Sequence, residues 1–282
     1  FDQTQRLASQ GDASAQYKLG LMYIYGEGVD SDSTKAIEWF KKAGNQGHAE
    51  ALYEIGSRYH YGLSVDKDFT KAVEWYEKAG NQGHAESQYK VAHIYKKGEG
   101  VDQDLAKAIE WFKKAGNQGH AEALYQVGEM YDQGKGVDRD MAKSIEWYEK
   151  SGNQGYTYAQ FRLGSMYFYG EAVYGKGVNK NYATAFKWYE KAANQGYDLS
   201  QKNLGNMYFN GQGVRQNYAK AIEWYEKAAN QGNFYSHLRL GDIYYDGEGV
   251  RQNTAIAKEW FGKACDIGSQ EGCDRYRALN QR

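Results

Sequence analysis

The chain has 282 residues, a net charge of −1, 27 Tyr, 7 Trp, 34 Gly and no Pro. A chain of this length forms either two domains or one elongated array of repeats. The near-zero charge argues against a nucleic-acid-binding or acidic-membrane-binding surface, and no apolar run approaches the roughly 18 residues that a membrane span needs.

A repeat organises the whole chain. The tryptophans follow one another at steps of 36 residues, with a single step of 41. A branched apolar residue and a tyrosine keep the same steps. The three series are Trp39, Trp75, Trp111, Trp147, Trp188, Trp224 and Trp260; Leu19, Ile55, Val91, Val127, Leu163, Leu204 and Leu240; and Tyr23, Tyr59, Tyr95, Tyr131, Tyr167, Tyr208 and Tyr244.

In chain order, residues 1–11 match the end of a repeat, because Gln10-Gly11 aligns with Gln46-Gly47. Seven full repeats then run over 12–268. A five-residue insertion near 171–176, around Ala172 and Val173, accounts for the long step. Residues 269–282 match a degraded first helix. We therefore expect a half-repeat cap and a capping helix at the two ends of the array, where a solenoid needs atypical units.

Each repeat is predicted to form two helices. In the first repeat, helix A runs from about Ala15 to Tyr25 and ends at a glycine turn that starts with Gly26. Helix B begins after Asp32, whose side chain suits the cap of a helix start. Helix B ends at Gly47. Its apolar stripe comprises residues 36, 39, 40 and 43, and the equivalent caps are Asp68, Asp104, Asp140, Asn181, Asn217 and Asn253.

Residues 19–43 read Leu-Gly-x-Met-Tyr-x-x-Gly-x-Gly-Val and then Asp-x-x-Lys-Ala-x-x-Trp-Phe-x-Lys-Ala. This pattern resembles the Sel-one-like repeat (SLR) family, whose period is longer than the roughly 34 residues of tetratricopeptide repeats. The chain departs from the family in lacking loop prolines and in placing Leu63-Ser64 in the second loop. The resemblance implies an all-α, right-handed superhelix (a solenoid of about seven helix pairs) whose helices A line a concave face that binds protein partners.

Positions that vary between repeats are not needed for stacking, so we expect the partner to bind there. One side of helix A varies most, and it is aromatic in repeats five to seven and mainly polar or charged in repeats two to four. The candidates are Tyr158, Phe161, Phe168, Tyr169, Phe209, Tyr235 and Tyr245, with His60, His93, Lys96 and Asp132. Exposed aromatic side chains are favoured anchors of protein interfaces. The alternative is that several of these rings pack between neighbouring helices.

The two cysteines occupy related places in the repeat. Cys265 stands at the Gly44 position, and Cys273 stands at the Leu52 position. These positions face each other across a turn, so we expect a disulfide that holds the last helix and an oxidising compartment. A reduced buried pair is the alternative. The last unit also resembles the Helicobacter cysteine-rich SLR subgroup.

No arrangement of residues predicts catalysis. Ser87 and Lys90 have the Ser-x-x-Lys spacing of penicillin-binding enzymes, but Ser87 replaces an alanine of other repeats, and no Lys-Thr-Gly or Ser-Asp-Asn accompanies it. His48, His84 and His120 recur a full repeat apart, which is too far to share one metal ion. We expect loop residues at these positions, and no catalytic residue, metal or cofactor.

The leading prediction is a non-enzymatic, monomeric scaffold for a protein partner, exported by a bacterium as an adaptor, a host-interaction factor or a toxin-immunity protein. Because the sequence starts at Phe1 without a signal peptide, we expect one to have been removed and the protein to be periplasmic or secreted. Two alternatives stay open: a module that binds peptidoglycan, and weak penicillin binding or β-lactamase activity as claimed for cysteine-rich relatives.

Overall fold

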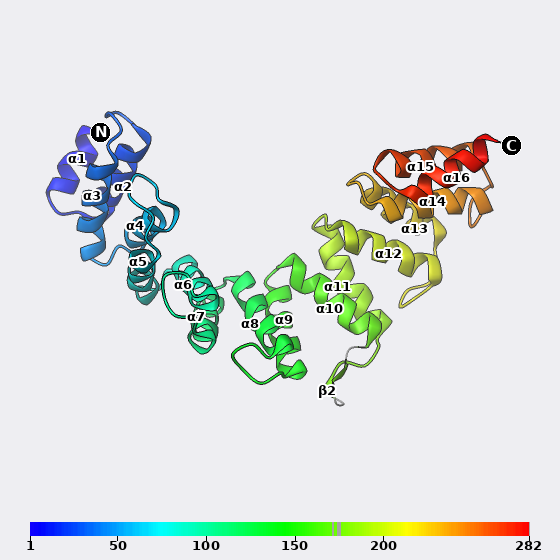
Figure 1. Cartoon of the computed structure of the whole chain (residues 1–282), viewed down its shortest axis with the longest axis horizontal. Coiled ribbons are helices and arrows are strands. Elements are labelled where there is room, and N and C mark those ends of the chain that lie inside the picture. The colour runs from blue at the N-terminus through cyan, green and yellow to red at the C-terminus, as the bar shows by residue number, and fades with distance from the viewer. Residues whose placement is uncertain (171, 174–175, 282) are drawn as a thin grey trace. The chain divides into compact units, whose positions relative to one another are not determined.

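The computed structural model describes residues 1–170, 172–173 and 176–281. These residues form sixteen helices and one pair of two-residue strands (Figure 1). The chain divides into two compact units, Phe1–Trp147 and Tyr148–Arg282, with the boundary inside α9. The prediction of an all-α chain built from consecutive helix pairs is confirmed.

In the first unit, α2 packs on α3, α4 on α5 and α6 on α7, and α3, α5 and α7 each pack on the helix that follows. We call α2, α4, α6 and α8 helices A, and their partners helices B. The helices that begin in this unit are α1 Asp2–Ser9, α2 Ala13–Tyr25, α3 Ser33–Asn45, α4 Ala49–Tyr61, α5 Phe69–Asn81, α6 Ala85–Lys97, α7 Leu105–Asn117, α8 Ala121–Gln133 and α9 Met141–Asn153.

In the second unit, the helices A are α10, α12 and α14, which pack on α11, α13 and α15; α16 packs on α15. The elements are α10 Thr157–Tyr169, β1 Ala172–Val173, β2 Lys176–Gly177, α11 Tyr182–Asn194, α12 Asp198–Asn210, α13 Tyr218–Ala229, α14 Phe234–Asp246, α15 Thr254–Asp266 and α16 Gln270–Asn280. The two strands pair antiparallel, with Ala172 opposite Gly177. They fall at the predicted insertion, of which Glu171, Tyr174 and Gly175 lie outside the described residues.

The helix boundaries follow the predicted caps. Asp32 Oδ1 accepts a hydrogen bond from Lys35 N at 3.0 Å, and the equivalent Asp or Asn of every later repeat accepts one in the same way. Helix A ends at Gly26, whose φ of +72° suits glycine. In the second repeat Ser64 takes the place of a loop glycine and keeps a φ of +61°, so the loop holds its shape without glycine there.

A buried ring of helix B fills each pair. Tyr225 is fully buried against α12, and an ideal Cβ at Gly205 would lie 2.6 Å from its ring. Contacts of this kind recur at Gly20 with Phe40, Gly56 with Tyr76, Gly164 with Tyr189, and Gly241 with Phe261. Glycine lets the ring approach the backbone of helix A most closely at these five positions, whereas Ala92 takes the equivalent place in the third repeat.

A second set of contacts joins helix B to the next helix A in several repeats. Gln88 Nε2 donates to Gly80 O at 2.7 Å, and Gln118 Nε2 donates to Gln88 Oε1 at 2.7 Å. The same pair of bonds recurs at Gln16 and Gln46, and at Gln201 and Gln231. The single sequence gave no reason to single out these glutamines, although their spacing matches the repeat.

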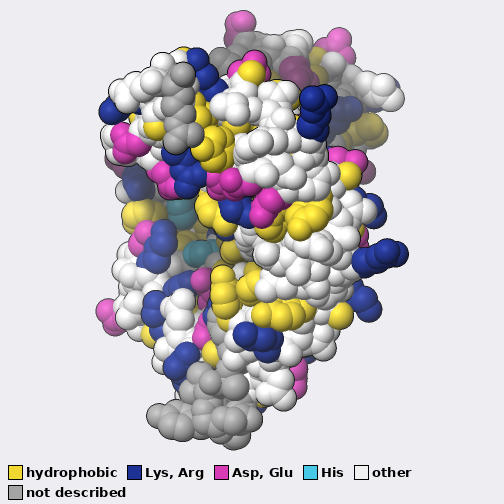
Figure 2. Space-filling view, turned by 90° about the vertical axis from the view of Figure 1, so that its right-hand side faces the viewer, with side chains coloured by type: hydrophobic (Ala, Val, Ile, Leu, Met, Phe, Trp, Pro, Cys, Tyr) yellow, Lys and Arg dark blue, Asp and Glu magenta, His cyan; other side chains and the backbone are white. Residues whose placement is uncertain are grey.

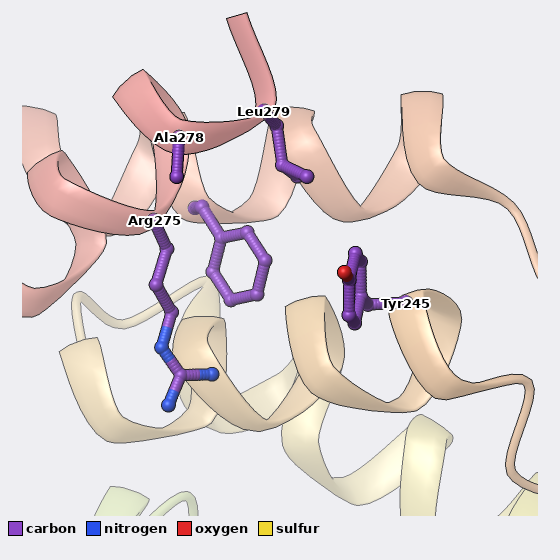
Figure 3. A pocket seen from close by; sticks show the side chains of 5 residues that line it. Tyr245, Arg275, Ala278 and Leu279 are labelled. Atoms are coloured by element: carbon purple, nitrogen blue, oxygen red, sulfur yellow. The ribbon is translucent and has the colours of Figure 1, made fainter. Parts of the chain in front are cut away.

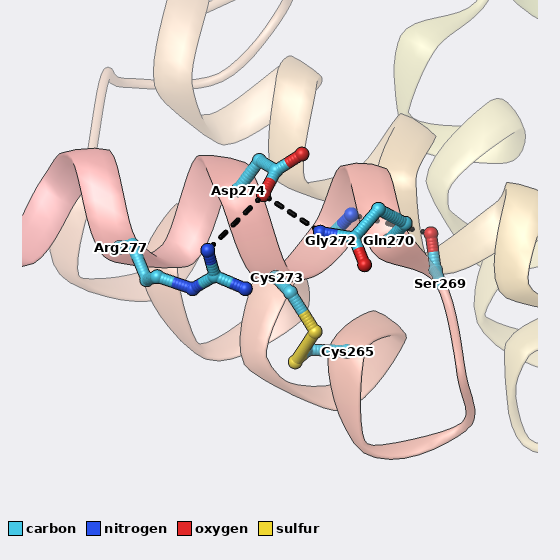
Figure 4. The surroundings of a disulfide bond; sticks show 7 residues. All are labelled: Cys265, Ser269, Gln270, Gly272, Cys273, Asp274 and Arg277. Atoms are coloured by element: carbon cyan, nitrogen blue, oxygen red, sulfur yellow. Dashed lines mark hydrogen bonds and ion pairs between the residues drawn. A yellow bond between two sulfur atoms is a disulfide. The ribbon is translucent and has the colours of Figure 1, made fainter.

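The last repeat replaces this contact with a disulfide. Cys265 and Cys273 stand at the Gly80 and Gln88 positions, and the predicted disulfide joins them with their Cα atoms 4.5 Å apart. Figure 4 shows it linking the end of α15 to α16. A covalent bond thus holds the final described helix at a register position where other repeats have glutamine, leucine or, in His237, histidine.

We expect Gly205→Ala to lower the free energy of unfolding by about 1–3 kcal/mol, because the added methyl meets a ring that is buried on all sides. Thermal unfolding followed by circular dichroism measures the change. Ala92 holds the equivalent position in the third repeat, so Ala92→Gly serves as the matched control; it should cost about 1 kcal/mol through helix propensity and roughly as much again through the loss of a buried methyl group. A higher midpoint for Gly205→Ala than for the unchanged chain would contradict the contact.

We expect the double substitution Cys265→Ser/Cys273→Ser to lower the free energy of opening of α16 by about 2.5 kcal/mol, the chain-entropy value for a loop with a separation of 8. Hydrogen exchange of the amides of residues 270–280 measures it, with the amides of α12 as an internal control. Equal exchange at α16 in both proteins would show that packing alone holds the helix.

Candidate functional site

The predicted residues of the first unit fall into two groups. His60 and His93 line one cavity of about 260 Å³ together with Tyr89. Lys96 and Asp132 have their own partners instead: Lys96 Nζ donates to Gln126 Oε1 at 2.7 Å, and Asp132 pairs with Arg139 at 3.7 Å. The structure therefore brings two of the four residues together.

Burial shapes the chemistry of this cavity. The His93 ring lies 5.1 Å from the ring of Phe112, and burial, helped by Lys96, lowers the pKa of His93 to about 4. Burial lowers the pKa of His60 as well. Carboxylates close to the cavity compensate the charges of the two lysines that line it. Lys90 pairs with Glu86 at 3.2 Å, and Lys97 pairs with Glu99 at 3.4 Å.

The three tyrosines predicted for the second unit reach the solvent. Tyr158, Tyr169 and Tyr235 have exposed fractions of 53%, 68% and 40%. Tyr158 leans on Tyr197, whose ring lies 5.4 Å away, whereas Tyr169 and Tyr235 both line one cavity. The exposure expected of these three tyrosines is therefore observed, and their role as interface anchors stays a prediction.

The remaining predicted rings of this unit are half-buried against helices B. Phe168 lies 5.0 Å from the ring of Tyr182, and Phe209 lies 5.2 Å from the ring of Tyr218. Phe161 packs against the core cluster around Tyr189, and Tyr245 packs against the one around Phe261. The alternative interpretation, that rings pack between neighbouring helices, therefore applies to these four side chains.

At one position of helix A, the residue type varies between repeats because it must match the buried ring of helix B. Tyr76 Oη donates to Ser57 Oγ at 3.2 Å, and the same bond joins Tyr189 to Ser165 and Tyr225 to Asn206. Where the buried ring of helix B carries no hydroxyl, the helix-A residue at this position differs, as in Leu21, His93 and Asp242. The expectation that variable positions have no role in packing is wrong here.

A column of ring contacts runs between successive helices A. Tyr17 stacks on His48 with ring centres 4.6 Å apart, and the same contact recurs as Tyr53 on His84, Tyr89 on His120, and Phe161 on Tyr197. The second residue of each contact precedes the next helix A. His84 Nδ1 and His120 Nδ1 accept the backbone N–H groups of Ser87 and Ala123. These histidines lie in the turns between helices, as expected, and His84 and His120 also cap the helix A that follows.

The column stops at the sixth repeat, where Lys202 stands at the Tyr17 position. Lys202 lines a cavity of about 240 Å³ in the second unit, which we call the Lys202 pocket; its other residues are Phe168, Tyr169, Tyr189, Asn203, Asn206 and Tyr235. Sequence reasoning missed Lys202, although a lysine where five repeats have an aromatic ring was a usable signal.

A further cavity, of about 230 Å³, lies between α14 and α16. Arg275, Ala278 and Leu279 reach it from α16, opposite Tyr245 of α14 (Figure 3). The charge of Arg275 is compensated within the chain, because its guanidinium pairs with Asp242 and, at 2.6 Å, with Glu271. This cavity therefore offers an apolar surface without a free charge.

Figure 2 shows hydrophobic side chains in separate surface patches with Lys, Arg, Asp and Glu between them. Within residues 1–170, 172–173 and 176–281, no three His, Cys, Asp or Glu side chains are grouped to hold a metal ion. No helix in this part of the chain is long and apolar enough to cross a membrane. Ser87 is fully buried, and its hydroxyl contacts His84 Nδ1 at 2.8 Å, so it has no access to a substrate.

Seven consecutive segments match the sequence model of the Sel1 repeat: residues 13–48, 49–84, 85–120, 121–156, 157–197, 199–233 and 235–269. A comparison with curated proteins gave no match.

Three solved structures illustrate the likeness. A protective antigen present in uropathogenic Escherichia coli strains, which displays an SLR fold, is 35% identical with a TM-score of 0.89; the match covers 100% of this chain and 59% of that one. A Sel1 repeat protein from Oxalobacter formigenes is 30% identical with a TM-score of 0.76, over 98% and 78%. Cysteine rich protein B of Helicobacter pylori is 29% identical with a TM-score of 0.37, over 50% and 98%.

We expect the stability of the chain to fall as the pH drops from about 6.5 to about 4, because the folded protein holds His93 neutral while the unfolded chain takes up the proton first. His93→Leu should make this fall shallower, since Leu21 occupies the equivalent position in the first repeat and packs in the core cluster that contains Phe40. Urea unfolding of both proteins at pH 7.5 and at pH about 4.5 measures the difference. An equal loss in both proteins would show that His93 does not contribute.

Proposed function

The chain belongs to the Sel1 repeat family, and on that premise we propose that it is a non-enzymatic scaffold that binds a partner protein through its helices A. The observation that carries the proposal is the pair of exposed tyrosines, Tyr169 and Tyr235, at one cavity of the second unit. Each ring offers apolar area and a hydroxyl at a low entropic cost, which is the usual property of an interface anchor.

The contacts of the other predicted rings narrow the binding surface. Phe168 lies between the helices and the cavity, so it supports the surface and contributes one edge to it. Phe209 sits beneath the guanidinium of Arg239, 4.8 Å from its ring centre. We assign the direct contacts to Tyr158, Tyr169 and Tyr235, and a supporting role to Phe161, Phe168, Phe209 and Tyr245. In the first unit we assign a secondary surface to His60 and His93, and we assign no direct contact to Lys96 and Asp132, which have partners within the chain.

We further propose that the protein is exported by a bacterium and works as a monomer in the periplasm or outside the cell. The disulfide between Cys265 and Cys273 supports an oxidising compartment. The Escherichia coli relative is described as a protective antigen, and among adaptor, host-interaction and toxin-immunity roles this likeness favours host interaction.

We expect Tyr169→Ala/Tyr235→Ala to weaken partner binding by a hundredfold or more, because two interface anchors of about 2 kcal/mol each are removed. Affinity capture with the purified chain, followed by mass spectrometry and by titration of the captured protein, measures the effect. Tyr25→Ala/Tyr276→Ala is the control, since both of these tyrosines are exposed and neither lines the cavity of Tyr169 and Tyr235 or that of His60 and His93.

Either of two results would count against the proposal. A captured protein that binds both double variants equally well would place the interface elsewhere. Capture of peptidoglycan fragments in place of a protein would favour the alternative of a cell-wall-binding module, in which Tyr169 and Tyr235 stack on sugar rings.

A further inference from the structure

The sixth repeat breaks the column of ring contacts and leaves a space in its place. The residue equivalent to Tyr17 is aromatic in the first five repeats, where it is Tyr17, Tyr53, Tyr89, Tyr125 and Phe161. In the sixth repeat it is Lys202. In α10 the ring of Phe161 packs 5.0 Å from Tyr197, which precedes α12. In α12 Lys202 has no ring that could pack against α14 in this way. A cavity of about 240 Å³ lies beside the Lys202 side chain.

The charge of Lys202 is not neutralised within the described part of the chain. No carboxylate among the described residues lies within 4.0 Å of the Lys202 Nζ, which is the limit for an ion pair. The Nζ lies 5.4 Å from the centre of the Tyr235 ring. The nearest candidate is Asp198, one turn earlier on α12, but its Oδ2 accepts a hydrogen bond from Asn233 Nδ2 at 2.9 Å. Burial lowers the pKa of Lys202, and the attraction of the nearby Asp198 carboxylate only partly opposes this.

The matching cavity of the first unit provides the contrast. There, Lys90 pairs with Glu86 at 3.2 Å and Lys97 with Glu99 at 3.4 Å, so that each lysine has an acidic neighbour of its own. The two cavities have similar sizes, yet only the Lys202 pocket presents a half-buried lysine without a carboxylate among the described residues. A cation in this state gains most from an incoming anion.

The other residues that line the Lys202 pocket suit the remaining parts of an anionic side chain. Tyr189 closes the inner end with an exposed fraction of 1%, while Tyr169 and Tyr235 form an open rim. Asn206 Oδ1 accepts from Tyr225 Oη at 2.6 Å, which leaves its amide N–H groups to donate. The volume lies below the roughly 300–1,000 Å³ of small-molecule sites, so it suits a single side chain better than a cofactor.

We propose that the Lys202 pocket receives an aspartate or glutamate side chain of the partner protein. The Lys202 ammonium pairs with the carboxylate, the amides of Asn203 and Asn206 donate hydrogen bonds to it, and the rings of Tyr169 and Tyr235 cover its aliphatic stem. This inference rests on the proposed function, since it names the chemistry of the partner at the same surface.

The test uses random twelve-residue peptides displayed on phage and selected on the intact, disulfide-bonded chain. We expect the selected peptides to share an acidic residue. Replacing that residue by its amide, or introducing Lys202→Gln, should each weaken binding about tenfold or more in fluorescence anisotropy. The two changes together should weaken it no further, because they remove the same ion pair.

Two further variants serve as controls. Lys187→Gln removes an exposed lysine of α11 and should leave the affinity unchanged. Lys202→Tyr introduces the aromatic residue type of the first five repeats, so it should keep or raise the melting temperature while abolishing peptide binding. If the Lys202→Tyr chain is folded, its loss of peptide binding is due to the filled pocket and not to unfolding.

The outcomes separate the inference from the function on which it rests. Peptides whose binding depends on Tyr169 and Tyr235, but is equal for the unchanged chain and Lys202→Gln, would overturn the inference and leave the scaffold function standing. Additive effects of the two charge changes would also overturn it. If no peptide is selected and the chain binds N-acetylmuramic acid instead, both the inference and the proposed function fail.

Discussion

The contact between the buried ring of helix B and the bare backbone of helix A sets the geometry of the helix pairs. In the second unit, Tyr189, Tyr225 and Phe261 are 3% exposed or less, and each ring lies where a side chain on the facing glycine would stand. Because the ring fills the space that a Cβ would need, the two helices pack at van der Waals contact along their length. The small residues of the stripe, such as Ala221 and Ala228, are fully buried for the same reason.

Once this contact fixes the pair, the same register positions meet in every repeat, and a change at one of them has a predictable place in space. The position of Gln88 shows this well. It carries a glutamine that bonds a backbone carbonyl in the third repeat, a leucine in the second and the disulfide-bonded Cys273 in the last unit. Three different interactions thus fasten a helix A to the preceding helix B through one geometry.

The difference between the two units follows from the same logic. In the first unit, Tyr53 and Tyr89 pack on the histidines that cap the next helices, and the lysines beside the cavity have acidic partners. The lysines of that surface are therefore satisfied from within, although among the described residues His60 Nδ1 and His93 Nε2 have no hydrogen-bond partner. In the second unit, the aromatic column ends at Lys202, and the half-buried lysine and the exposed tyrosines beside it are groups whose free energy an outside partner can lower. This contrast is why the proposed binding surface lies there.

The sequence by itself determined everything that depends on neighbours in the chain: the 36-residue period, the ends of the helices at Asp32 and Gly26, and the pairing of Cys265 with Cys273. Caps and turns are local, so the residue types predict them. The tertiary structure alone decided that Phe168 and Phe209 are half-buried while Tyr169 and Tyr235 are exposed, and that Asp198 accepts a hydrogen bond from Asn233 without forming an ion pair with Lys202. All of these residues lie on helices A, and their burial and pairing depend on side chains from neighbouring helices that a helical projection does not contain.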